Sequence, residues 1–79
     1  MKESVDEQLL HAFQAVFPAH SDEQLRQGTP DTLTTWDSSN HMILIMVIEE
    51  AFGIRIPERE AGELLSFSEF RGYLSSRTT

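Results

Sequence analysis

The fold of this chain is decided by its longest apolar stretch, which runs Trp36-Asp37-Ser38-Ser39-Asn40-His41-Met42-Ile43-Leu44-Ile45-Met46-Val47-Ile48-Glu49-Glu50-Ala51-Phe52-Gly53. Asp37 and Ser38 are residue types that cap helix N-termini, because their side-chain oxygens accept hydrogen bonds from the amides of a first turn. Gly53 is the residue type that most often follows the end of a helix. The stretch therefore predicts a helix from about Ser38 to Phe52.

This predicted helix is apolar on two sides. At about 100° per residue, one stripe has the pattern of a helix packed on a core. That stripe comprises His41, Leu44, Ile45, Ile48 and Phe52, and the opposite face comprises Ser39, Met42, Ile43, Met46, Glu49 and Glu50. The helix is therefore either buried all round or presents its second face to a partner.

The composition limits what the chain can do. Residues 1–79 are expected to form a single small domain, in which a deep catalytic cleft is not expected. The absence of cysteine excludes disulfides and thiolate metal sites. The net charge of −7 disfavours binding to nucleic-acid phosphates and favours partners with basic surfaces. No apolar run reaches the roughly 18–20 residues that span a bilayer, and the first residues lack the apolar stretch of a signal peptide, so a cytoplasmic protein is expected.

The segments before this helix predict one helix and a long loop. Ser4 and Glu7 have the spacing of a capping box, which predicts the start of a helix that ends before Pro18. The polar segment 18–36 predicts a long loop, in which residues 21–25 could form one helical turn. Its expected anchors on the core are Leu25, Leu33 and Trp36.

The segments after Gly53 predict two further helices. Residues 54–57 predict a loop whose isoleucines, Ile54 and Ile56, fill the core, and residues 58–63 predict a short helix after Pro57. Ser66 and Glu69 repeat the capping-box spacing before a last helix with Phe67, Phe70, Tyr73 and Leu74 on its apolar side. The tail, residues 75–79, is expected to fray. Together the segments predict an all-α fold, a small irregular four-helix bundle of three longer helices and one short helix, with a long loop between the first two helices.

Two kinds of chemistry are not supported by the residue pattern. Asp37, Ser38 and His41 have the residue types of a catalytic triad, but a nucleophilic serine needs an oriented base, an oxyanion hole and a pocket that excludes water, and no G-x-S-x-G turn is present. We therefore predict no catalytic residue. His11, His20 and His41 are spread over separate segments without the spacing of metal ligands, so no metal site is predicted.

The central stretch resembles a known family. The residues that carry the resemblance are Asp37-Ser38 opening an apolar helix, the ending Glu49-Glu50-Ala51-Phe52-Gly53-Ile54, and Ile56-Pro57-Glu58 after it. In this order they are similar to an acyl carrier protein, over residues 36–74. The resemblance implies that Ser38, preceded by Asp37, carries a 4′-phosphopantetheine arm through a phosphodiester, and that the thiol of the arm holds an acyl group as a thioester. Ser39 stands where the family nearly always has leucine.

The resemblance also implies a role and a set of partners. It implies a monomeric, free-standing carrier, not an enzyme, for fatty acid, specialised lipid or polyketide biosynthesis. Its partners would be a phosphopantetheinyl transferase and enzymes of the acyl-ligase, ketosynthase or acyltransferase type with basic or apolar docking surfaces. The resemblance implies that Glu49 and Glu50 dock partner enzymes, and because Ile43 stands at a position that is commonly acidic in the family, docking is expected to lean on apolar contact, which gives the docking residues Ser39, Met42, Ile43, Met46, Glu49 and Glu50. The candidate lining of an acyl pocket is Ile48, Phe52, Ile56 and Leu65.

Two alternatives remain open from the sequence. An aminoacyl or peptidyl carrier would use the same arm on the same helix. A helical protein-interaction module without a prosthetic group is the other alternative, and the serine at position 39 is its best support.

Overall fold

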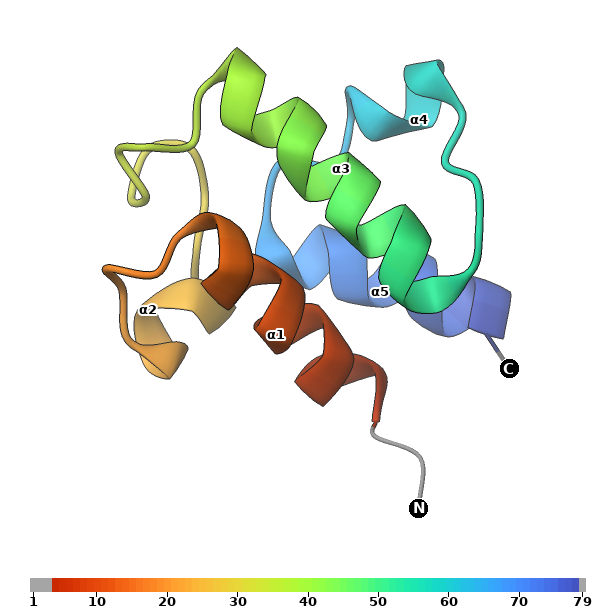
Figure 1. Ribbon diagram of the computed structural model, residues 1–79, viewed down its shortest axis with the longest axis horizontal. Coiled ribbons are helices and arrows are strands. Elements are labelled where there is room, and N and C mark those ends of the chain that lie inside the picture. The colour runs from red at the N-terminus through yellow and green to blue at the C-terminus, as the bar shows by residue number, and fades with distance from the viewer. Residues whose placement is uncertain (1–3, 79) are drawn as a thin grey trace.

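Helices make up the fold, as predicted. In the computed structural model, which describes residues 4–78, the chain forms five helices and no strand within that range (Figure 1). The helices are α1 (Val5–Val16), α2 (Asp22–Arg26), α3 (Ser38–Phe52), α4 (Glu58–Ala61) and α5 (Phe67–Thr78). The three longer helices are those that the sequence predicts, but the described residues hold two short helices and not one. The additional helix, α2, divides the predicted long loop, because Ser21 and Gln24 form a complete capping box at its start.

Local signals fix the bounds of α3 where the sequence predicts them. The Asp37 carboxylate accepts a hydrogen bond from the Asn40 amide at 2.9 Å, which makes Asp37 the N-cap and Ser38 the first helical residue. Gly53 follows the helix with φ of 65°, a left-handed conformation that favours glycine. Ser4 caps α1 in the same way, accepting a hydrogen bond from the Glu7 amide at 3.1 Å.

The core is organised around α1, which contacts α2, α3 and α5. Phe13 of α1 is fully buried, and its ring centroid lies 5.5 Å from that of Trp36, 5.0 Å from that of Phe67 and 5.8 Å from that of Phe70. Edge-to-face pairs at these distances add to the free energy gained from burial alone. The predicted anchors of the first connection, Leu25, Leu33 and Trp36, are all buried, so this prediction is confirmed.

The segment between α2 and α3 passes close to the start of α5 at Gly28. The Gly28 carbonyl accepts a hydrogen bond from the Phe67 amide at 3.1 Å. A Cβ at this position would lie 2.5 Å from Cδ1 of Leu33, which is far inside van der Waals contact. Only glycine lets the backbone pass here without displacing the buried Leu33 side chain.

Residues 75–78, for which the sequence predicts a fraying tail, continue α5, while Thr79 lies outside the described residues. Arg77 holds this end of the helix in place. Its guanidinium donates a hydrogen bond to the Glu60 carboxylate at 2.8 Å and lies 4.1 Å above the ring of Tyr73. Glu60 is distant from Arg77 in the sequence, and Tyr73 lies one helical turn before it. Composition alone therefore does not reveal either contact.

No helix among residues 4–78 has the length and apolar character needed to cross a bilayer.

Candidate functional site

Ser38 lies at an exposed and well-defined position. It is the first residue of α3, and its side chain is exposed. The backbone around it is fixed, because Asp37 caps the helix and the Asn40 side chain donates a hydrogen bond to the Thr35 carbonyl at 2.6 Å. Ser39, the neighbouring serine, is exposed as well. Both hydroxyls are therefore accessible to another protein.

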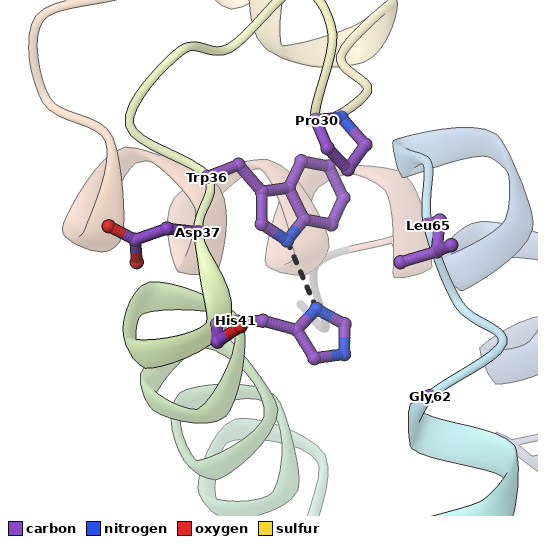
Figure 2. Close-up of a pocket in the computed structure, with 7 residues that line it drawn as sticks. Pro30, Trp36, Asp37, His41, Gly62 and Leu65 are labelled. Atoms are coloured by element: carbon purple, nitrogen blue, oxygen red, sulfur yellow. Dashed lines mark hydrogen bonds between the residues drawn. The ribbon is translucent and has the colours of Figure 1, made fainter.

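A hollow of about 440 Å³ opens beside Ser38. We call it the Ser38 hollow; it is lined by Pro30, Trp36, Asp37, Ser38, His41, Gly62 and Leu65. Figure 2 shows Pro30 and Trp36 at one end, Leu65 facing them from the segment before α5, and His41 below Trp36. Its residues come from three separate parts of the chain, so the hollow depends on the tertiary fold.

His41 holds one wall of this hollow through two hydrogen bonds. The indole N–H of Trp36 donates to Nδ1 of His41 at 3.0 Å, and Nε2 of His41 lies 2.8 Å from the carbonyl oxygen of Ala61. An indole nitrogen only donates and a carbonyl oxygen only accepts, so this network assigns the imidazole as neutral with its proton on Nε2. The two rings are nearly parallel, at 16°, with centroids 6.0 Å apart.

These two hydrogen bonds affect whether His41 could act with Asp37 and Ser38 as a catalytic triad. Both ring nitrogens of His41 are engaged, with Trp36 and with Ala61, so neither is free to accept a proton from Ser38. His41 is therefore not oriented as a general base toward Ser38. Among the described residues, no group of three or more His, Cys, Asp or Glu side chains could hold a metal ion.

The outward face of α3 is apolar and exposed. The exposed fractions are 67% for Met42, 43% for Ile43 and 58% for Met46. Such a cluster is typical of a surface that meets another molecule. Ser39 and Glu50 lie exposed on the same helix.

Glu49 has a structural contact that the sequence does not reveal. Its carboxylate accepts a hydrogen bond from the Ile56 backbone amide at 2.8 Å, and its side chain is half-buried. This bond fixes the loop between α3 and α4. Of the two adjacent carboxylates, only Glu50 points freely to solvent.

A second hollow, of about 360 Å³, lies between α3 and α4. We call it the α4 groove; its apolar lining is Met42, Ile45, Met46, Ile56 and Ala61, with His41, Glu49, Glu58 and Gly62 completing it. His41 and Gly62 thus belong to both hollows.

The four candidate acyl-pocket residues lie in different surroundings. Ile56 lines the α4 groove, whereas Leu65 is 47% exposed and lines the Ser38 hollow. Ile48 is fully buried in the core, and the half-buried Phe52 packs against that core. From the segment before α5 it is Leu64, and not Leu65, that enters the core, while an acyl pocket among the four residues stays a prediction.

A cluster of polar side chains ties α4 to α5. The Tyr73 hydroxyl donates to the Glu60 carboxylate at 2.6 Å, and Arg77 donates to the same oxygen. These two hydrogen bonds lower the pKa of Glu60 below its usual value, that from Tyr73 contributing more. Burial, followed by the bond to Glu60, raises the pKa of Tyr73. The four-residue spacing of Tyr73 and Arg77 is the only sequence signal for this cluster.

In comparisons with known proteins, no family model matches this chain and no curated protein matches it significantly.

Proposed function

We propose that this protein is a carrier that holds acyl groups as thioesters on a 4′-phosphopantetheine arm attached to Ser38. The observation that carries the proposal is the position of Ser38, which is exposed on the first turn of α3 directly after the capping Asp37 and beside an apolar hollow. In this fold α1, α3, α4 and α5 would form the four-helix carrier bundle, with α2 as part of its long connection.

Several properties of the site suit an attached phosphodiester. The N-terminus of a helix favours negative charge, because its first amides and its macrodipole are positive. α3 has 15 residues, and its first turn carries no acidic residue after the cap. The arm would supply the thiol that the chain itself lacks, since it contains no cysteine. His41 is bonded to Trp36 and Ala61 and does not serve Ser38 as a base, so we expect a separate enzyme to modify Ser38.

The proposed docking surface is the outward face of α3, formed by Ser39, Met42, Ile43, Met46 and Glu50. It would meet a phosphopantetheinyl transferase and enzymes of the acyl-ligase, ketosynthase or acyltransferase type. Exposed methionines adapt to different apolar partners, and the net charge of −7 favours basic rims around them. Glu49 contributes less to this surface, because its carboxylate is bonded to the Ile56 amide. We place the carrier in the cytoplasm, as a monomer that serves fatty acid, specialised lipid or polyketide biosynthesis.

A second candidate is a helical interaction module without any prosthetic group. The exposed apolar face of α3 favours it as much as it favours the carrier, and Ser39 departs from the carrier motif. An aminoacyl or peptidyl carrier would share the arm and differ only in cargo.

Incubation with coenzyme A and a broad-specificity phosphopantetheinyl transferase tests the proposal. Intact mass should rise by one phosphopantetheine, and peptide mapping should locate it on Ser38. Ser38→Ala should abolish the gain, while the matched control Ser39→Ala should retain it, with thermal melts showing that both variants fold. No mass gain in a folded wild-type protein would favour the interaction module, and an arm on Ser39 would refute the assigned site.

A further inference from the structure

The two hollows beside α3 are separated by a single side chain. His41 and Gly62 line both, and the bond from Nε2 of His41 to the Ala61 carbonyl, at 2.8 Å, crosses from α3 to α4. In Figure 2 the imidazole of His41 projects from α3 toward the segment that contains Gly62. The Ser38 hollow therefore ends at His41, and the α4 groove begins behind it.

Helix α4, which carries the acceptor of this bond, is short and has no fully buried residue. α4 has four residues, none of them buried. The hydrogen bonds that hold it are those of Ala61 with His41 and of Glu60 with Tyr73 and Arg77. Ala61 packs against the core, and the buried Ile56 and Leu64 anchor the chain on either side of α4, so the position of α4 is held from both ends and the His41 bond joins it to α3 between the two hollows.

From this geometry we propose that His41 limits the length of apolar chain that can be buried from position 38. A chain tethered there fills the Ser38 hollow, against Trp36 and Leu65, and stops at His41. The α4 groove, with Met46 and Ile56, stays out of reach while the His41–Ala61 bond is intact. The role of His41 in selecting cargo rests on the proposed function, whereas the division itself does not.

The interactions favour the arrangement in which His41 stays bonded to Ala61 and Trp36. A chain that passes His41 must separate it from Ala61 and from Trp36, which leaves the indole N–H and both imidazole nitrogens without these partners, while the Ala61 carbonyl keeps its bond from the Leu64 amide at 3.3 Å. Unpaired polar groups of this kind cost about as much as the burial of several methylenes gains. A chain that is only a few carbons longer than the Ser38 hollow therefore gains nothing by crossing, and its end remains in solvent.

The test uses a chain attached without any transferase. The protein has no cysteine, so Ser38→Cys introduces a single thiol. Alkyl methanethiosulfonates form a mixed disulfide with this thiol and release methanesulfinate, which gives a graded series from butyl to dodecyl. We expect the melting temperature to rise with the first members and then level off. In Ser38→Cys/His41→Ala it should continue to rise, by a few degrees for each methylene buried.

The methyl signals of the methionines give a second, local measurement. Met42 and Met46 line the α4 groove and not the Ser38 hollow. In the Ser38→Cys protein their methyl NMR signals should stay unmoved by every chain, and in the His41→Ala background the dodecyl chain should shift them. A dodecyl chain that shifts Met46 while His41 is present overturns the proposal, and this measurement decides it even if His41→Ala fails to fold.

His20→Ala is the matched control, because it makes the same substitution at a histidine that lines neither hollow. Combined with Ser38→Cys, it should level off at the same chain length as Ser38→Cys alone. If it extends the limit as His41→Ala does, loss of the His41–Ala61 bond does not set the limit and the proposal fails. Failure of wild-type Ser38 to accept phosphopantetheine would refute the proposed function and leave these results unchanged.

Discussion

Removing the carboxylate of Glu49 should destabilise the protein, while the same change at Glu50 should not. The two residues are adjacent near the end of α3, but only Glu49 accepts the Ile56 amide, at 2.8 Å. Ile56 is 6% exposed, so its amide has little access to water once that acceptor is lost. A hydrogen bond to a charged group contributes about 1.5–3 kcal/mol. For a domain of this size each kcal/mol lowers the melting temperature by about 4–8 °C, so Glu49→Ala should lower it by about 6–24 °C.

The comparison with Glu50→Ala removes the main competing effect. A carboxylate near the C-terminus of a helix is slightly unfavourable to the macrodipole, and both substitutions relieve that effect equally. Thermal and urea unfolding, followed by circular dichroism, measures the difference between the variants. Equal melting temperatures for Glu49→Ala and Glu50→Ala would refute the argument that the Ile56 bond supports the loop.

Three further predictions concern the surface, a close contact and pH. Ile43→Glu should change the free energy of unfolding by no more than about 0.5 kcal/mol, since Ile43 is 43% exposed, whereas Leu44→Glu should unfold the domain by placing a charge in the core. Gly28→Ala should destabilise by about 1–3 kcal/mol, because its Cβ has no room, while Gly72→Ala in α5, with nothing within 4 Å, should stabilise by about 0.5–1 kcal/mol. The raised pKa of Tyr73 means that the folded state holds the phenol proton more tightly than the unfolded state, so this contribution is complete below the usual value of 10.0 and is lost as the pH rises above it. The melting temperature of wild type should therefore fall more steeply above that pH than that of Tyr73→Phe.

Each of these has a contrary outcome that melting curves can detect. An unfolded Ile43→Glu would mean that the outward face of α3 belongs to the core. A Gly28→Ala protein as stable as wild type would mean that Leu33 yields without cost. Parallel alkaline melting curves for wild type and Tyr73→Phe would mean that the phenol ionises equally in both states.

Most of the helices could be predicted from the sequence because their signals are local. Asp37 and Gly53 bound α3 through their own side chain and backbone, within one turn of the ends. The helical period also places Met42 and Ile43 opposite the core stripe, but it left open whether that face is buried, and only the folded chain shows that it is exposed.

The remaining features depend on contacts between distant segments. Leu64 and Leu65 are indistinguishable by residue type, yet one is buried and the other lines a hollow. The Glu49 bond to Ile56 depends on the path of the loop after α3. The exposed position of Ser38 follows from the helix start, but the hollow beside it does not, because the segments that build it meet only in the folded chain.

The single tryptophan of this chain gives the protein an intrinsic optical probe at the site. Trp36 is 4% exposed, lines the Ser38 hollow and donates its indole proton to His41. Its emission should therefore be that of a sheltered indole and should change when the hollow fills or when the bond to His41 breaks. Attachment of a chain at position 38 could then be followed in real time by stopped-flow fluorescence, with no added dye and no second tryptophan to correct for.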